Sequence, residues 1–207
     1  MQPELQMIIS VLTAGKPEEA NETQLQRKLD MTPSEFRHRY HSFAELMRAC
    51  AHYCAVLLRT ELDLVWRLPE NAVQKLYYSL VVLQRPENQK RRRYFDLLEG
   101  QYPLLAAEIK PELVTDVRKH FQRVIIKGKQ EDYVLPQIEA PATADRLWYL
   151  NSVALQNSLR AAPGYYWLEE VVHVLWPIVL QLFTITGRTA MDVSLATYPQ
   201  AFNKYSR

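Results

Sequence analysis

Polar side chains that can form directed hydrogen bonds cluster near the amino-terminus, at Thr32, Ser34, Arg37, His38 and His41. Hydroxyl, guanidinium and imidazole groups are donors and acceptors that suit base edges and phosphates. Such recognition needs the groups to project together from one surface of a helix. The chemistry indicated is therefore binding, provided that the local structure places these side chains together.

Residues 22–48 are predicted to form two helices separated by a tight turn at residues 30–32. In the first helix, Leu25 and Leu29 lie four residues apart and share one face, which suits packing against a neighbouring helix. Met31 is expected to fill the turn. The pattern is the layout of a helix-turn-helix, and an ordinary helical hairpin is the alternative.

The second helix has a clear predicted start. Thr32 is a good N-cap, Pro33 suits the first helical position, and Glu35 lies three residues after the cap, as in a capping box. This helix is expected to continue to about residue 52. Polar residues between 34 and 41 lie on its outer face, while its inward stripe comprises Phe36, Tyr40, Phe43, Leu46 and Met47.

An apolar segment, Leu5–Leu12, precedes this pair and is predicted to be a helix that ends at Gly15. After the pair, the segments 55–59 and 62–68 resemble two short strands joined by polar residues, because apolar and polar residues alternate from Leu62 onward. This pattern favours a β-hairpin wing. The alternative is one continuous helix over residues 42–68, since Ala, Leu and Arg favour helix.

This combination resembles a winged helix-turn-helix domain over the first third of the chain. With helices after the wing, it is somewhat similar to the Mga-type and sugar-transport-regulated bacterial transcription regulators. The sequence departs from the pattern of this family at the start of the second helix. Pro33, Ser34 and Glu35 stand there in place of the usual exposed Arg, Lys, Gln or Asn. It implies that the helix residues Thr32, Ser34, Arg37, His38 and His41 approach DNA, with Arg59 and Thr60 at the wing tip near phosphates.

The overall charge gives weak support to DNA binding. The 207 residues contain 25 Lys and Arg against 23 Asp and Glu, a net charge of +2, so contact must depend on where the cations lie. Further phosphate contacts are assigned to Lys28 and to the basic run Lys90, Arg91, Arg92 and Arg93. The alternative for the run is a solvated helix face, because four consecutive helical residues point in different directions.

The remainder of the chain is predicted to form further helices, from residue 71 through the hydrophobic segment 165–186, with a long surface loop at residues 129–143. The expected fold is therefore mostly α: a winged helix-turn-helix with a short β-hairpin, followed by an all-helical domain. The predicted domains are 1–84, comprising the winged helix-turn-helix and a linker helix, and 85–207, a helical regulatory or dimerisation domain.

Features typical of enzymes are missing from the sequence. It has no Walker-type phosphate loop, GxSxG elbow or HExxH pair. Cys50 and Cys54 lie one helical turn apart, without the CxxC spacing of structural zinc sites, and are interpreted as buried thiols. Glu169, Glu170 and His173 are the one acid and imidazole cluster, and packing is the preferred interpretation. We expect no catalytic residues, no metal and no cofactor.

These observations lead to one main hypothesis and one alternative. The main hypothesis is a non-enzymatic transcription regulator that binds double-stranded DNA as a homodimer, reading the major groove through the helix that begins at Pro33. The alternative is a helical adaptor or inhibitor that binds a protein partner through the winged-helix surface. The sequence shows no secretory signal at its start and no membrane-spanning stretch, so a cytoplasmic location without membrane association is expected.

Overall fold

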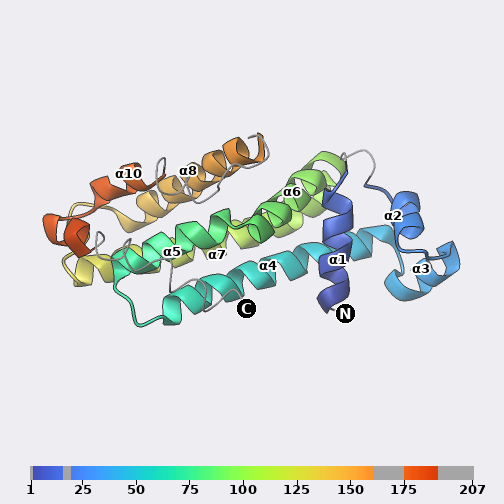
Figure 1. Ribbon diagram of the computed structural model, residues 1–207, viewed down its shortest axis with the longest axis horizontal. Coiled ribbons are helices and arrows are strands. Elements are labelled where there is room, and N and C mark those ends of the chain that lie inside the picture. Colours follow the sequence, from blue (N-terminus) through green and yellow to red (C-terminus); the bar gives the residue numbers. More distant parts are fainter. Residues whose placement is uncertain (1, 16–19, 161–174, 191–207) are drawn as a thin grey trace. The chain divides into compact units, whose positions relative to one another are not determined.

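The computed structural model describes residues 2–15, 20–160 and 175–190, and these are almost entirely helical (Figure 1). Within these ranges, the extended pairing is one isolated bridge between Val134 and Phe183. The prediction of a mostly α fold is confirmed. The chain divides into two compact units, one formed by residues 1–60 and 86–115 and the other by residues 61–85 and 116–207. The predicted boundary after residue 84 falls between a helix of the second unit and a helix of the first.

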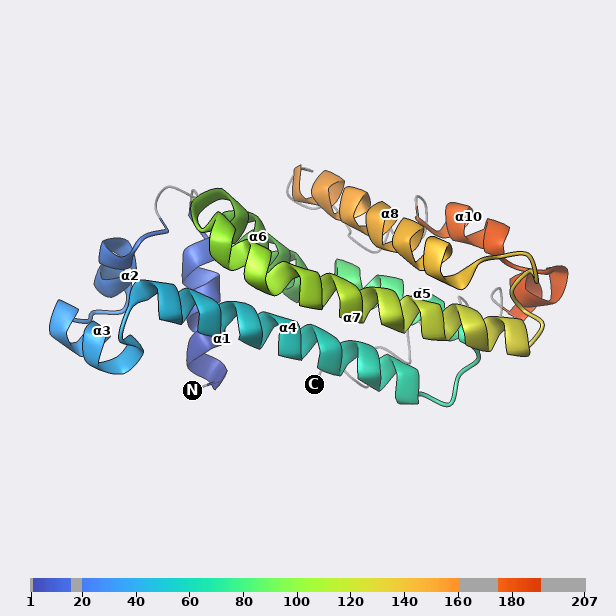
Figure 2. The ribbon, with the colours of Figure 1, turned by 180° about the vertical axis from the view of Figure 1, so that it is seen from behind.

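The first unit is built on an amino-terminal helix that packs against two others. Helix α1 buries Leu5, Ile8, Ile9 and Leu12, whose spacing forms one face, and it contacts α2 and α6. Helices α2 and α3 form one end of this unit (Figures 1 and 2). Its elements are α1 (Gln2–Thr13), α2 (Glu22–Lys28), α3 (Pro33–Tyr40), α6 (Pro86–Gln101) and the first parts of α4 (Phe43–Arg67) and α7 (Pro103–Gln130).

Aromatic side chains hold the first unit together. The Phe36 ring is fully buried, with its centroid 5.1 Å from that of Tyr40 and 6.4 Å from that of Phe43. Deeper in the unit, the buried hydroxyl of Tyr94 on α6 donates to the carbonyl oxygen of Met47 on α4 at 2.6 Å. A buried hydroxyl must find such a partner, so this bond fixes α6 against α4.

The predicted long second helix is wrong, because it ends early. Helix α3 stops at Tyr40, and His41 has a φ of 59°, a left-handed backbone that L residues rarely adopt. The side chain of Ser42 then accepts from the backbone N–H of Glu45 at 3.2 Å as α4 begins at Phe43. The predicted apolar stripe is therefore shared between two helices that meet at a sharp bend.

The predicted β-hairpin wing is also wrong, and the alternative of one continuous helix is correct. Helix α4 runs without interruption through residues 55–68 as far as Arg67. Its buried side chains, which include Leu58, Leu62 and Val65, recur every three or four residues, whereas Leu64 is 58% exposed. The alternation from Leu62 onward suggested a strand because the period of a strand and the period of a helix both place Leu62 inside. Only the burial of the side chains around it distinguishes the two structures.

The second unit surrounds one nearly enclosed helix. From Ala72 to Gln84, every residue of α5 except Gln74 is buried, as expected for a helix that other elements cover on all sides. None of the described helices is long and apolar enough to cross a bilayer. The other described elements include the last part of α4, the second part of α7, α8 (Ala140–Arg160), α10 (Trp176–Val179) and the 3-10 helix Leu180–Leu182.

A buried lysine closes the carboxyl end of α4 in this unit. The ammonium group of Lys75 on α5 donates to the carbonyl oxygens of Trp66, at 2.6 Å, and of Leu68. The last carbonyls of a helix lack partners within the helix, so a cation there is favourable. Glu131, at the end of α7, accepts from the backbone N–H of Ala72 at 2.8 Å. These three hydrogen bonds join the end of α4, the start of α5 and the end of α7.

A buried histidine lies beside that lysine. Nε2 of His120 is 2.7 Å from Oγ of Ser79, and the single Ser79 hydroxyl proton is donated to the carbonyl of Lys75, also at 2.7 Å. Nε2 of His120 must therefore carry a proton and donate to Ser79. Among the described residues, no group hydrogen-bonds to Nδ1. Burial, with the nearby charges of Arg123 and Lys75, lowers the pKa of His120 from 6.5 to about 4.

We predict that this histidine makes the second unit sensitive to acid. Because the folded pKa lies below the unfolded one, the unfolded chain binds the proton first as pH falls, so stability is full above pH 6.5 and declines toward pH 4. The complete loss is about 3 kcal/mol. Urea denaturation across this range measures it. His120→Gln should flatten the pH dependence and exposed His52→Gln should not; an unchanged slope in His120→Gln would contradict the assignment.

Candidate nucleic-acid interface

The turn between α2 and α3 is compact and fully hydrogen-bonded. Helix α2 starts at the N-cap Asn21, whose side chain accepts from the backbone N–H of Gln24 at 3.0 Å. After α2, Asp30 has a φ of 53°, which reverses the chain, and the N–H of Met31 donates to the carbonyl of Gln26 at 3.0 Å. The predicted helix–turn–helix arrangement and the turn at residues 30–32 are confirmed.

The start of α3 is fixed by a complete capping box. The Thr32 hydroxyl accepts from the backbone N–H of Glu35 at 3.2 Å, and the Glu35 carboxylate accepts from the backbone N–H of Thr32 at 2.8 Å. The Thr32 hydroxyl also donates to this carboxylate at 2.7 Å. These bonds lower the pKa of Glu35. Thr32, predicted to approach DNA, and Glu35, a carboxylate that would repel phosphate, are thus occupied with each other.

Three of the predicted contact residues share one exposed face of α3, and a fourth follows at its C-cap. Ser34, Arg37 and His38 are exposed, and their spacing of three and four residues repeats the helical turn; His41, also exposed, follows directly as the C-cap with a left-handed backbone. The opposite face carries Phe36, which is fully buried. The helix therefore presents one guanidinium, one imidazole and one hydroxyl together, with a second imidazole at its end, and we refer to these four residues as the α3 outer face.

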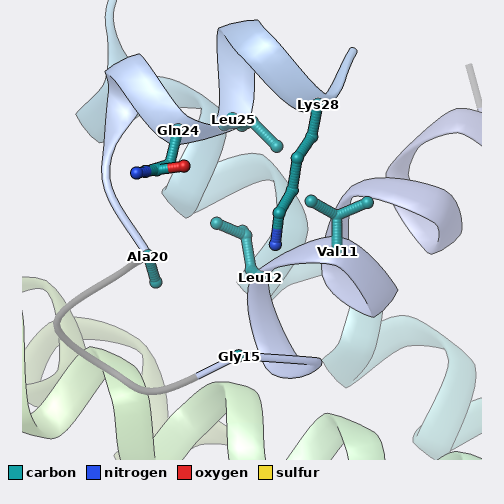
Figure 3. Close-up of a pocket in the computed structure, with 7 residues that line it drawn as sticks. All are labelled: Val11, Leu12, Gly15, Ala20, Gln24, Leu25 and Lys28. Carbon is teal, nitrogen blue, oxygen red and sulfur yellow. The ribbon is translucent and has the colours of Figure 1, made fainter.

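Lys28, predicted to contact phosphate, lies at the edge of a small pocket between α1 and α2. Figure 3 shows its side chain extending toward Val11 and Leu12 of α1, while Leu25 covers the same pocket from α2. Its aliphatic carbons therefore cover apolar surface, as long cationic side chains commonly do. The residue is exposed, and in this conformation its ammonium group points toward α1 (Figure 3).

The basic run on α6 does not extend the α3 outer face. The basic run lies near the start of α6, and in both views this end of α6 is the one farther from α2 and α3 (Figures 1 and 2). Arg92 pairs with Asp96 at 3.0 Å, and Arg91 donates to the side chain of Asn88 at 2.5 Å. Lys90 and Arg93 are exposed. The run is spread around its helix, as the alternative interpretation of a solvated face expects.

The residues assigned to the wing tip lie within α4. Arg59 forms an ion pair with Glu112 of α7 at 2.9 Å, and the Thr60 hydroxyl donates to the carbonyl of Val56 at 2.9 Å. Their predicted placement at a wing tip is wrong, because no hairpin exists in this part of the described chain. Both side chains instead contribute to the surface of a continuous helix.

The other chemically reactive groups do not form a site within the described ranges. Cys50 and Cys54 are free and buried on α4, and burial raises the pKa of each thiol to about 12. Thiols in such surroundings are unreactive, which agrees with the prediction of buried thiols. No group of His, Cys, Asp and Glu suited to metal binding occurs among the residues described. The segment holding Glu169, Glu170 and His173 lies outside them.

Sequence reasoning missed one contact that bears directly on this region. Glu4 of α1 accepts a hydrogen bond from the Tyr40 hydroxyl and forms an ion pair with Arg39 at 2.9 Å. Thirty-five residues separate Glu4 from Arg39, and no local pattern links the two positions. The spacing of Tyr40 placed it in the inward stripe. Its hydroxyl was the one signal that could have indicated the contact, since a partly buried phenol needs a hydrogen-bond partner.

Comparison with known proteins gives structural matches alone. No family model matches the sequence, and no curated protein matches it significantly. A transcriptional regulator from Rhodococcus sp. Rha1 has a TM-score of 0.69 and 15% identity, covering 88% of this chain and 97% of that one. A TetR-family regulator from Agrobacterium tumefaciens has a TM-score of 0.72 and 9% identity, covering 89% of this chain and 100% of that one. NemR from E. coli, in its reduced form, has a TM-score of 0.68 and 13% identity, covering 88% of this chain and 97% of that one.

These similarities show a fold of the TetR type, with an amino-terminal helix-turn-helix and a helical remainder. The resemblance to winged-helix and Mga-type regulators is therefore wrong. The helix-turn-helix itself was correctly predicted from the cap and turn residues. The error arose after it, where α4 was interpreted as a strand pair.

We predict that the capping box determines the stability of α3. Thr32→Val keeps the shape of the side chain but removes its hydroxyl, and should cost about 1 kcal/mol of unfolding free energy. Faster amide hydrogen exchange in α3 should accompany this loss. Thr23→Val, at an exposed position near the start of α2, is the matched control. Equal effects from the two substitutions would argue against a capping role for Thr32.

Proposed function

We propose that the chain is a DNA-binding transcription regulator that reads the major groove through the α3 outer face. The observation that carries the proposal is that Ser34, Arg37 and His38 share one exposed face of a capped helix in a helix-turn-helix, with exposed His41 at its C-cap. The major groove is wide enough to admit such a helix, and the second helix of the motif normally supplies the base contacts.

The structural similarities support this proposal. Those compared above include regulators described as transcriptional, and one is described as a member of the TetR family. Their identities of 9–15% support a shared fold, and function is inferred from the site. The adaptor hypothesis depended on a winged-helix surface, and no wing exists in the described part of the chain. The preferred function is therefore non-catalytic DNA binding.

The residues proposed to bind DNA follow from their positions. Arg37 is the cation at the centre of the α3 outer face, and a guanidinium can bind the O6 and N7 atoms of guanine together. Ser34, His38 and His41 are proposed to contact neighbouring bases or phosphates. Thr32 is proposed to act through the cap. Lys28, Lys90 and Arg93 remain exposed cations that can add phosphate contacts outside the α3 outer face.

We predict that Arg37 determines sequence preference. The purified chain should bind mixed duplex DNA at low salt and weaken steeply as salt rises, because phosphate contacts release counterions. Duplexes that the wild type selects from a random pool should bind more tightly than mixed DNA. Arg37→Gln should reduce this preference for the selected duplexes about tenfold. Arg67→Gln, at an exposed position at the end of α4 in the second unit, makes the same charge change as a control. If both variants lose affinity equally, or the wild type binds no DNA, the proposal fails.

A homodimer is proposed as the binding form. Two recognition helices can enter successive major grooves if their centres lie about 34 Å apart. In the second unit, Tyr149 and Val153 lie four residues apart on α8 and are 67% and 37% exposed, so they offer an apolar face to a second copy.

We predict that Tyr149→Asp disrupts this dimer. A carboxylate on an apolar contact face costs desolvation energy, so light scattering after gel filtration should show a shift toward the monomer mass. Leu104→Asp is the control, because Leu104 is 88% exposed at the start of α7 in the first unit. A monomeric wild type, or identical behaviour of the two variants, would reject the α8 interface.

A further inference from the structure

The last two residues of α3 are both held by one carboxylate from α1. One oxygen of Glu4, Oε1, accepts a hydrogen bond from the Tyr40 hydroxyl, while Oε2 lies 2.9 Å from the guanidinium nitrogen of Arg39. The guanidinium carbon of Arg39 also lies 5.9 Å from the centre of the Tyr40 ring. Glu4, Arg39 and Tyr40 therefore form a closed cluster, in which each member contacts the other two.

The cluster is anchored on its inner side and open on its outer side. The side chain of Glu4 is 19% exposed, whereas that of Arg39 is 55% exposed. Tyr40 packs against the buried Phe36 ring with a centroid separation of 5.1 Å. Burial and the hydrogen bond to Glu4 raise the pKa of Tyr40, so its phenol remains a donor at ordinary pH. Arg39 is consequently the member that can leave most easily.

The position of Arg39 gives this contact a consequence for DNA binding. Arg39 is next to His38 in sequence and lies one helical turn after Glu35, at the flank of the α3 outer face. A guanidinium at the flank of a recognition helix is well placed for a phosphate. Carboxylate and phosphate bind the same guanidinium edges, so Glu4 competes with the DNA backbone for Arg39.

We propose that Glu4 is a positioning residue that fixes the carboxyl end of α3 and keeps Arg39 from contacting phosphate. This inference depends on the proposed DNA-binding function. Phosphate contacts strengthen binding to every sequence, whereas base contacts discriminate between sequences. By occupying Arg39, Glu4 lowers the sequence-independent part of the affinity and leaves Arg37 as the cation that faces the bases.

The proposal makes a specific prediction for four proteins: the wild type, Glu4→Gln, Arg39→Gln and the double variant. Glu4→Gln removes the negative charge and should release Arg39 to one additional phosphate. The slope of log affinity against log salt should then steepen by about 0.9, which corresponds to an additional loss of about 3.5-fold between 50 and 200 mM salt. Arg39→Gln alone should leave the slope unchanged, and in the double variant it should abolish the gain.

Binding to mixed duplex DNA across a salt series measures these slopes. Glu87→Gln on α6 is the control, since it changes the net charge equally at an exposed position. A steeper slope in Glu4→Gln that the double variant reverses supports the proposal. If Glu4→Gln matches the wild type, if Glu87→Gln has the same effect, or if Arg39→Gln alone flattens the slope, the proposal is overturned.

A second measurement does not require DNA. Hydrogen exchange of the backbone amides at the end of α3 should become faster in Glu4→Gln and remain unchanged in Glu87→Gln, because the contact fixes that end of the helix. Unchanged exchange in Glu4→Gln would show that the cluster does not position α3. If the wild type binds no DNA but exchange responds, the proposed function has failed while the structural contact stands.

Discussion

The apolar stripe of α4 is the constraint on which the described structure depends. Its buried side chains recur at helical spacing from Leu46 to Val65, and both units bury part of it. A strand pair would have moved half of these side chains to the opposite face and exposed them to water. Each apolar side chain left exposed costs roughly 1.5–3 kcal/mol relative to burial, which outweighs the preferences of individual residues for strand. The continuous helix also gives Phe43 the position from which it packs against Phe36 of α3.

The chemistry of α3 is limited by the contacts around it. Glu35 is bonded to Thr32, and Arg39 is paired with Glu4, so one carboxylate and one cation are engaged within the protein. What remains is a narrow face with a single arginine and two histidines. Such a face suits recognition by a few directed bonds better than attraction by net charge, which agrees with a chain whose formal charge is only +2.

The second unit buries several polar groups in its interior. Lys75 closes the carboxyl end of α4, and the neutral imidazole of His120 bonds to Ser79 in the same region. Gln84 likewise donates from α5 to the Asn151 side chain on α8 at 2.8 Å. Buried polar groups of this kind cost free energy unless their partners are correctly placed, so they favour one arrangement of α4, α5, α7 and α8 over its alternatives.

The sequence by itself determined the elements whose signals are local. Thr32, Pro33 and Glu35 defined the start of α3, and the residues between 34 and 41 indicated its outer face, because caps and helical spacing depend on neighbours within one or two turns. Tertiary structure alone decided what depended on distant partners. It made α4 one helix, ended α3 at Tyr40, paired Arg59 with Glu112 and joined Glu4 to Arg39. The physical reason is that burial and ion pairing are settled by groups far away in the chain, which no short stretch of sequence contains.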